Sequence, residues 1–426
     1  MAVHMSTVIS RELGHITEHL SKLQPILSQH PLLYTISASQ NTRSSDLSIL
    51  VSSLQGLSHR SVGCLSAAIP SAGPSWRQHT SVSLAAFDER HATLFRSTIP
   101  GRKAVQVGRW HAMHKDAQPD HEEPALGESM PDWDNTMSRV YEGQALPVEL
   151  ESLRAADVHS ILYFSDNAPE GLCSSLLKFR LATKLGLIGT STPFVTGRPY
   201  TLFHNERIHS DGAVGVCLSS SARPAAYSVF PGLEAITRPM IVTDSDGNLV
   251  NSLDHANPSS LLLHAIKNHP AVAGSAQGIS PDLRLYIGTL HQKANGHQEL
   301  VQLSSIMSGD PSRGSIALDA EGAPAEGSLV QIFLLPPSAS LDVLGEAQRH
   351  SGAPEPRLAF ASTSLDEAEA RSISEEVEDH GATVLEDTFL AASENGCIVS
   401  RSADGESERP WKCAVPGATM GLQWAA

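Results

Sequence analysis

The sequence predicts an α+β protein with mixed, largely antiparallel sheets flanked by helices. Short apolar and β-branched runs alternate with segments of helical periodicity, and hairpin signals dominate the later part of the chain. This order is not a regular strand–helix–strand series, which would predict a parallel sheet. The chain has 426 residues, of which 41% are hydrophobic, so we expect two or three domains with sizeable cores and exclude a wholly disordered chain.

The first elements follow from the spacing of apolar residues. Residues up to about Pro31 are expected to form a helix, because Ile16, Leu20, Leu23 and Leu27 recur at helical intervals. The next elements are expected to be a buried strand at 32–36, a helix at 47–54, and strands at 61–64 and 80–84.

A second unit repeats this order after a polar insertion. Residues 97–150 are rich in Pro, Asp, Glu, His and Trp and have little periodicity, which predicts an insertion or linker. Beyond it we expect a strand at 159–164, a helix at 172–179, and strands at 186–192, 198–204 and 212–218. The similar units, at about 30–96 and 158–220, indicate an internal duplication within an N region of residues 1–228.

Residues 229–426 are expected to form a second region rich in hairpins. Strands at 239–243 and 249–253 flank the turn signal Asp244-Ser245-Asp246-Gly247-Asn248. Further strands are expected at 285–287, 301–303, 315–318, 329–334 and 358–363, with a helix around Ile373 and Val377.

Charge and cysteine usage limit the partners and the compartment. Lys plus Arg is 30 and Asp plus Glu is 46, and a net charge of −16 argues against nucleic acid or an anionic membrane as a partner. We see neither an apolar run of membrane-spanning length nor a secretory signal. The five Cys residues form no CxxC pair, which is typical of free thiols in a reducing compartment. We therefore expect a cytoplasmic protein, or a mitochondrial-matrix one if a presequence has been removed.

Three segments in order resemble the FIST (F-box and intracellular signal transduction) family. Val62-Gly63-Cys64-Leu65-Ser66 is similar to the Gly-Cys-Ser turn of the family's N region. Residues 203–216 resemble its hairpin leading to a Gly-Ala-Val-Gly-Val strand, and residues 307–316 resemble the Gly-Asp turn of its C region. Here the strand at 358–363 lacks the Cys of the C region, and no Gly-Glu-Ile follows Cys397. An F-box is also missing, so the resemblance does not imply a Skp1-type adaptor as a partner.

The resemblance implies an intracellular sensor or adaptor that binds a small molecule, an amino acid or a related metabolite. No catalytic chemistry comes with it. Two alternatives stay open. One is a hydrolase or lyase that uses Cys64, Asp166 or a His in a cleft, and the other is a protein-interaction receptor without its F-box.

Candidate ligand-binding residues lie where the expected strands end. If the two units pair, such ends would line one cleft with hydroxyl groups that bind carboxylate, ammonium or amide groups. The alternative is ordinary turn and helix-cap chemistry. The residues at these ends are Ser37, Ser39, Ser66, Ser165, Asp166, Gly189, Thr190 and Thr192.

The Gly63-Cys64 pair is a second candidate. Glycine lets a ligand approach the backbone closely, and the thiol of Cys64 would contact a ligand or act as a nucleophile if its pKa were lowered. The alternative is a small buried Cys. In the C region, Asp310 and Arg313 fit a turn, and Arg313 could alternatively clamp a carboxylate.

No metal site is expected, and the sequence leaves the cofactor unknown. A dense run at His111, His114, Asp116 and 120–123 has ligand-type residues, but a solvated acidic insertion explains it more simply. Asp244, Asp246 and Asn248 begin like a calcium loop, yet the sixth position is Leu249 and the twelfth is His255. Neither a GxGxxG after a strand nor a P-loop occurs, so no cofactor can be named.

Overall fold

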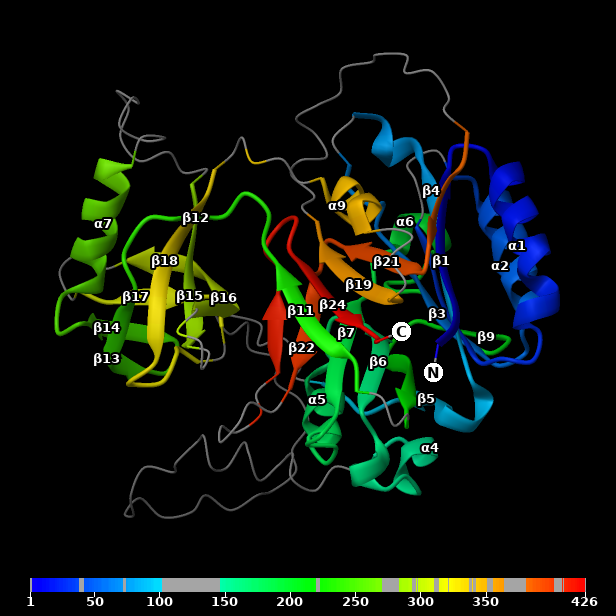
Figure 1. Cartoon of the computed structure of the whole chain (residues 1–426), viewed down its shortest axis with the longest axis horizontal. Helices are drawn as coiled ribbons and strands as arrows, with labels where there is room; N and C mark the ends of the chain where they lie inside the picture. Colours follow the sequence, from blue (N-terminus) through cyan, green and yellow to red (C-terminus); the bar gives the residue numbers. More distant parts are fainter. Residues whose placement is uncertain are drawn as a thin grey trace, which may run out of the picture.

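The computed structural model assigns the chain to the α+β class and contains two lobes (Figure 1). A larger body holds both ends of the chain, and a smaller lobe contains β12 to β18 with helix α7. The structure describes residues 2–37, 42–71, 74–101, 146–219, 223–269, 283–292, 296, 298–309, 314–320, 322–336, 339, 342–350, 355–363, 381–401, 408 and 410–425.

The first sheet of the body is built mainly from the start of the chain. Its order is β20-β1-β4-β2-β3-β8-β9. Helices α1 (Leu13–Leu27) and α2 (Ser44–Leu57) pack on its outer face through a stripe of Leu and Ile side chains. Its strands are β1 (Ala2–Ser10), β2 (Leu32–Ser37), β3 (Ser61–Ser66), β4 (Thr80–Phe87), β8 (Leu202–His204), β9 (Arg207–His209) and β20 (Thr383–Glu386).

The second sheet has the order β23-β22-β7-β6-β10-β5. Helix α5 (Glu170–Leu176) and the single turn α4 (Val148–Glu151) cover its outer face. Its strands are β5 (Ala92–Ser97), β6 (Ser160–Ser165), β7 (Thr183–Ile188), β10 (Ala213–Leu218), β22 (Cys397–Ser400) and β23 (Trp411–Cys413).

The third sheet combines strands from the later part of the chain in the order β11-β24-β19-β21. Helix α9 (Val343–His350) packs on its outer face. Its strands are β11 (Ala225–Val229), β19 (Arg357–Ser362), β21 (Thr388–Ser393) and β24 (Thr419–Gln423).

The three sheets share one four-strand arrangement. Each contains a parallel pair, namely β2/β3, β6/β7 and β19/β21. In each, an antiparallel strand joins the first member of the pair and a further antiparallel strand follows, giving β1-β4-β2-β3, β5-β10-β6-β7 and β11-β24-β19-β21. The duplication within the N region stays a prediction, which this common strand order supports.

Hairpins tie the sheets to one another. The hairpin β8–β9 lies between β7 and β10 in sequence but pairs with β3 of the first sheet. The hairpin β22–β23 lies between β21 and β24 but pairs with β7 of the second sheet. Apolar residues from the inner faces of all three sheets, including Val62, Leu185 and Phe360, then meet in one shared core.

The smaller lobe is a closed antiparallel barrel. Its strands run in the order β18-β13-β14-β17-β16-β15, and β15 pairs back onto β18, which closes the ring. Helix α7 (Pro258–Asn268) contributes Leu262 and Ile266 to the core of this lobe. The strands are β12 (Glu234–Ala235), β13 (Met240–Asp246), β14 (Leu249–Leu253), β15 (Arg284–Gln292), β16 (Gln298–Gly309), β17 (Ile316–Leu318) and β18 (Leu329–Leu335).

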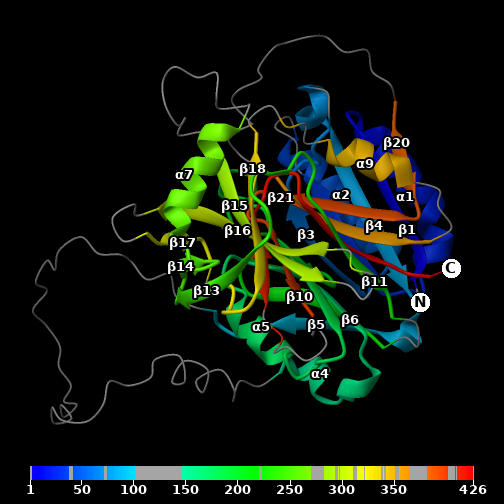
Figure 2. The same ribbon diagram turned by 60° about the vertical axis from the view of Figure 1, so that its left-hand side comes forward.

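The barrel packs on the body through a few aromatic side chains. The indole Nε1 of Trp411 donates a hydrogen bond to the Leu303 carbonyl at 3.1 Å. The Phe230 ring lies 6.3 Å from the Trp411 ring, and Tyr286 and Phe333 of the barrel join the shared core of the body. Figure 2 shows the barrel beside the second and third sheets.

Two expected elements were wrong. Residues 2–10 form strand β1, whereas only Leu13–Leu27 is helical, because β1 finds strand partners in β4 and β20. In the stretch 198–204 only Leu202–His204 is a strand, and the residues before it belong to a loop. The expected helix around Ile373 and most of the 97–150 insertion lie outside the described residues. Within the part of the chain that is described, no helix is long and apolar enough to cross a membrane.

Candidate functional site

The carboxyl ends of three strands meet in the body, one strand from each sheet. The Thr190 amide donates to the Leu65 carbonyl at 3.2 Å, which joins the ends of β7 and β3. The Ala67 amide donates to the Ala392 carbonyl at 2.8 Å, which joins the ends of β3 and β21. The Ile188 amide donates to the Gly396 carbonyl at 3.1 Å, which joins the end of β7 to the segment after β21. We call this meeting point the strand-end junction.

A row of buried serines crosses the junction. Paired registers place Ser81 beside Ser37, Ser37 beside Ser66, and Ser362 beside Ser393. The antiparallel bridge between residues 67 and 392 brings Ser66 and Ser393 next to each other. The row therefore extends over β4, β2, β3, β21 and β19, and all five side chains are buried.

The serine row is only partly satisfied by hydrogen bonds. The backbone amide and the hydroxyl of Ser81 both donate to Ser37 Oγ, at 2.8 and 2.7 Å. The backbone amide of Asn395 donates to Ser393 Oγ at 3.0 Å. Ser362 Oγ is buried and has no hydrogen-bond partner among the described residues. Two of the predicted site residues, Ser37 and Ser66, thus belong to a polar layer at one end of the shared core.

Gly63 and Cys64 are held inside strand β3. A Cβ atom at Gly63 would lie 2.6 Å from the Tyr34 ring, so the glycine makes room for this ring. The Cys64 side chain is fully buried, and burial raises the pKa of its thiol well above the ordinary value. A thiol in this state stays protonated near neutral pH, which disfavours a nucleophilic role.

Asp166 closes a turn after β6. Its Oδ2 accepts a hydrogen bond from the Gly212 amide at 2.6 Å, and its Oδ1 accepts one from the Ala168 amide at 2.9 Å. The Gly189 amide donates to the Ser165 carbonyl at 2.8 Å. Ser165 Oγ is buried without a partner among the described residues. Both carboxylate oxygens of Asp166 thus already accept a backbone hydrogen bond.

Thr190 and Thr192 belong to a loop that links the second and third sheets. Thr190 Oγ1 donates to the carboxylate of Glu394, and the Ser191 amide donates to Glu394 Oε1 at 2.9 Å. The Asn395 side chain donates to the Gly189 carbonyl at 2.8 Å. Of the other candidates, Ser39, Asp310 and Arg313 lie outside the described residues. A ligand contact at any predicted site residue stays a prediction.

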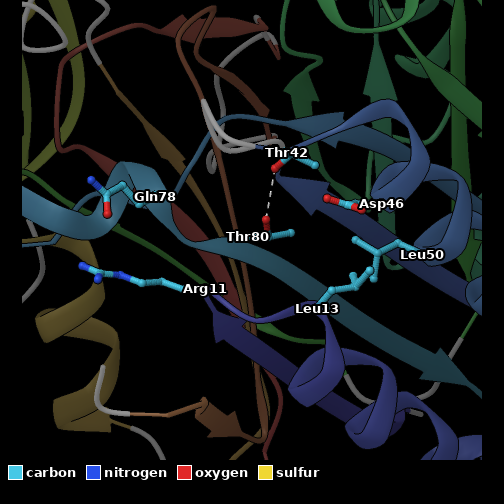
Figure 3. A pocket seen from close by; sticks show the side chains of 7 residues that line it. All are labelled: Arg11, Leu13, Thr42, Asp46, Leu50, Gln78 and Thr80. Carbon is cyan, nitrogen blue, oxygen red and sulfur yellow. Dashed lines mark hydrogen bonds between the residues drawn. The ribbon is translucent and has the colours of Figure 1, made fainter. Parts of the chain in front are cut away.

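A pocket with a volume of about 150 Å³ opens beside the start of α2 (Figure 3). Its two charged side chains, Arg11 and Asp46, lie on opposite sides of the space in this view. Thr42 and Thr80 are joined by a hydrogen bond of 3.2 Å between their hydroxyl oxygens. The full lining is Arg11, Leu13, Thr42, Asp46, Leu50, Gln78 and Thr80.

The pocket and the serine row share the same edge of the first sheet. Thr80 lines the pocket and precedes Ser81, the first member of the row. Strand β1 ends opposite Thr80, at Ser10, and therefore delivers Arg11 to the pocket. Asp46 is fixed at the third position of α2, where its Oδ2 accepts from the Arg43 amide at 3.4 Å.

This pocket was not predicted from the sequence. Residues 2–10 were expected to be helical, so Arg11 was not expected to follow a strand end. The Asp46 signal was present, since an acidic residue at the third helical position is typical of a helix start. Among the described residues there is no group of three or more His, Cys, Asp or Glu that could hold a metal ion. The acidic run at 111–123 lies outside them.

The family follows from the comparison with known protein families. The profile of the FIST N domain matches residues 33–256, slightly more than half of the chain, and the chain belongs to this family. No curated protein matches the sequence. The matched range runs from β2 to β14 and includes Gly63, Cys64 and five of the seven pocket residues. The resemblance of the later region to a FIST C region, and the boundary at residue 228, stay predictions.

Proposed function

We propose that this FIST-domain protein is a sensor that binds an amino acid or a related small metabolite in the pocket beside α2. The observation that carries this proposal is the pair of opposite charges across the pocket, Arg11 and Asp46. An Arg guanidinium pairs with a carboxylate through two hydrogen bonds, and a carboxylate accepts from an ammonium group. A zwitterion is complementary in charge to both sides of such a pocket.

The remaining lining suits the body of a small polar ligand. The hydroxyl groups of Thr42 and Thr80 and the amide of Gln78 both donate and accept hydrogen bonds. Leu13 and Leu50 supply an apolar side. A cavity of about 150 Å³ holds a group the size of a benzene ring, so the ligand is a small metabolite.

Two observations favour binding over catalysis. The Cys64 thiol is buried with a raised pKa, and both oxygens of Asp166 accept backbone hydrogen bonds. The Cys64 thiol therefore lacks the exposure and activation of a nucleophile, and the hydrogen bonds of Asp166 are those of a residue that closes a turn.

Titration calorimetry tests the proposal with three matched sets of ligands. The sets are amino acids, the amines that lack their carboxylate, and the acids that lack their ammonium group. We expect an amino acid to bind, and each truncated analogue to lose about tenfold or more, because one charged partner in the pocket is left unmatched. Equal binding of all three sets, or of none, would refute the proposal.

Two variants locate the site. Arg11→Gln should weaken binding by about 10- to 100-fold, since hydrogen bonds to charged groups contribute about 1.5–3 kcal/mol. Arg77→Gln is the matched control, because it removes the same charge next to the lining residue Gln78 without lining the pocket. An equal loss in both variants would show a general effect of charge instead of a pocket contact.

A further inference from the structure

Two buried cysteines lie opposite each other in the hairpin that ties the third sheet to the second. Cys397 of β22 and Cys413 of β23 are direct partners in the antiparallel register. Both side chains are fully buried and belong to the shared core. The Cys397 thiol donates to the Cys413 carbonyl at 3.9 Å, so its sulfur is turned toward the partner residue. We call these two residues the thiol pair.

The geometry of the thiol pair fits a disulfide bond. Residues directly opposite each other in an antiparallel ladder have Cα atoms about 4.5 or 5.5 Å apart, and their side chains leave the same face of the sheet. A disulfide bridges Cα atoms that are about 4.4–6.8 Å apart. The two sulfur atoms can therefore bond while β22 and β23 keep their register.

The other three cysteines have different surroundings. All five are free thiols. Cys64 and Cys217 lie in central strands, where their register partners are Thr, Leu and Ile residues. The Cys173 sulfur lies 3.3 Å from the hydroxyl oxygen of Tyr163. The pairing of one thiol with another in the register is therefore specific to Cys397 and Cys413.

The position of β23 gives the thiol pair a route to solvent. This strand has three residues and is the last in its sheet, and β22 is its sheet partner among the described strands. Edge segments that have few sheet hydrogen bonds open locally at a lower free energy than the whole fold. Contact with the Cys413 thiol and burial raise the pKa of Cys397, so the pair is inert while the hairpin is closed and reacts when it opens.

We propose that the thiol pair is a redox site, which a small-molecule disulfide such as oxidised glutathione converts into a Cys397–Cys413 disulfide. The Cys413 thiolate, on the edge strand, attacks one sulfur of the oxidant, forms a mixed disulfide and releases one glutathione thiolate. The Cys397 thiolate then attacks the Cys413 sulfur, which forms the protein disulfide and releases the second glutathione thiolate. The two cysteine protons pass through water to the released thiolates, and two electrons pass from the pair to the oxidant.

The disulfide fastens a hairpin that joins three parts of the molecule. Strand β22 pairs with β7 of the second sheet, and the Trp411 indole on β23 donates to the Leu303 carbonyl of the barrel. A covalent bond between β22 and β23 restricts the opened hairpin and so favours the closed one. Oxidation therefore strengthens the attachment of the barrel to the body. This site is separate from the ligand pocket and does not depend on the proposed sensing function.

A redox titration of the full chain tests the proposal. The folded protein is equilibrated with mixtures of reduced and oxidised glutathione and quenched with acid, and the remaining thiols are alkylated in denaturant. Trypsin cleaves after Arg401 and Lys412, so the thiol pair falls in two peptides that only a disulfide joins. We expect mass spectrometry to find these joined peptides, dithiothreitol to separate them, and Cys64 and Cys217 to stay open to alkylation.

Three variants separate the two steps of the reaction. We expect Cys397→Ala to accumulate a glutathione adduct on Cys413, because the thiol that resolves it is missing. At one concentration of reduced glutathione, half-maximal modification of Cys397→Ala or Cys413→Ala should need about tenfold or more oxidised glutathione than the wild-type chain, because the second step is then no longer intramolecular. Cys217→Ala removes another buried thiol and should leave disulfide formation unchanged.

Hydrogen exchange measures the structural effect of oxidation. We expect the backbone amides of β23 to exchange about tenfold or more slowly in the oxidised chain, because the disulfide restricts the opened hairpin. Equal exchange in the oxidised and reduced chains would contradict the fastening of the hairpin.

Two results of the titration would overturn the redox site itself. One is a folded wild-type chain that keeps all five thiols open to alkylation at every glutathione ratio, even if a disulfide forms in denaturant. The other is a disulfide that joins any other two cysteines. Both are measured on the wild-type chain, so they hold even where a variant fails to fold, which circular dichroism melting reports.

Discussion

Gly63 shows how one missing side chain shapes the first sheet. A Cβ atom there would lie 2.6 Å from the Tyr34 ring and 2.7 Å from the Tyr34 carbonyl oxygen. We expect Gly63→Ala to lower the free energy of unfolding by about 1–3 kcal/mol, since a fixed backbone atom cannot move away easily. Urea denaturation measures the change.

A second glycine provides the control. Gly56 lies in α2 and a Cβ atom there would meet nothing within 4 Å. Gly56→Ala should raise the free energy of unfolding by about 0.5 kcal/mol through helix propensity. If both variants changed stability in the same direction and to the same extent, the steric explanation for Gly63 would fail.

Individual residues also show how far the sequence predicts the site. Ser37 and Ser66 were placed correctly at strand ends, because their strands are read from local patterns. Ser362 and Ser393 could not be added to the same row. Ser393 lies beside Ser66 only through the bridge between residues 67 and 392, a contact with no local signal, and Ser362 joins the row through Ser393.

Among the elements, strand β7 carries a buried ion pair. The side chains of Lys184 and Glu408 are 2% and 5% exposed, and Lys184 Nζ lies 2.5 and 2.7 Å from the two carboxylate oxygens. Burial lowers the pKa of Lys184, and the Glu408 charge opposes this effect. We expect Glu408→Ala to cost about 3–5 kcal/mol of unfolding free energy, because it leaves a buried charge unpaired.

A double substitution distinguishes pairing from packing. Lys184→Met with Glu408→Leu should recover most of the loss, since two apolar side chains need no charge partner. The exposed pair of Glu18 and Lys22 on α1, 2.6 Å apart, is the control, and Lys22→Ala should cost less than about 0.5 kcal/mol. A Glu408→Ala effect as small as this control contradicts the prediction. Guanidinium unfolding compares all the variants.

Strand β1, helix α1 and strand β20 meet at a pair of histidines. His4 Nε2 and His19 Nε2 lie 2.9 and 3.3 Å from Ser6 Oγ, and Ser6 pairs with Glu386 of β20. Burial lowers the pKa of both histidines below 6.5, and the Glu386 charge opposes this shift. As the pH is lowered through 6.5, the unfolded chain therefore binds more protons than the folded chain. The free energy of unfolding decreases as the pH is lowered.

The pH dependence gives the corresponding measurement. Replacing His4 and His19 by Gln should flatten the decrease in unfolding free energy between about pH 6.5 and 5, and leave its shape near pH 8 unchanged. His59→Gln serves as the control, because it makes the same substitution at a side chain that is 90% exposed. An unchanged slope in the double variant would exclude this pair as its source.

The elements were predicted wherever local patterns determine them. The Leu and Ile stripe of α1 and the hairpin of β13 and β14 match the expected residues closely. Strand β1 was missed because its residues lie close to that helical stripe in the sequence and were assigned to the same helix. Its strand identity comes from β4 and β20, both distant in sequence.

At the scale of the whole molecule, the barrel is inserted between β11 and β19 of the third sheet. We expect Trp411→Ala to loosen the contact between the barrel and the body, because it removes the bond to Leu303 and a buried ring. Hydrogen exchange should then lose protection in β16 while β2 and β6 keep theirs. Trp411→Phe keeps an aromatic ring and loses only the hydrogen bond, so the free energy of opening of β16 should fall by about 1 kcal/mol, less than in Trp411→Ala.

Uniform loss of protection across the chain in Trp411→Ala would contradict this separation of the two lobes.

The closure of the barrel could not be predicted from the sequence. Its strands β15 and β18 were both expected, but nothing local indicates that they pair with each other. The charged pocket was missed for a similar reason, since Arg11 reaches it only because β1 is a strand.

The pairing of β1 with β20 also affects how the chain folds while it is being translated. Ser6 of β1 meets Glu386 of β20, so β1 stays without this partner until about 380 further residues have been translated. At about 5–20 residues per second, that interval is roughly 20 to 80 s. During this time the edges of β1 and β7 lack β20 and β22, and a nascent chain in this state is a natural client for a chaperone.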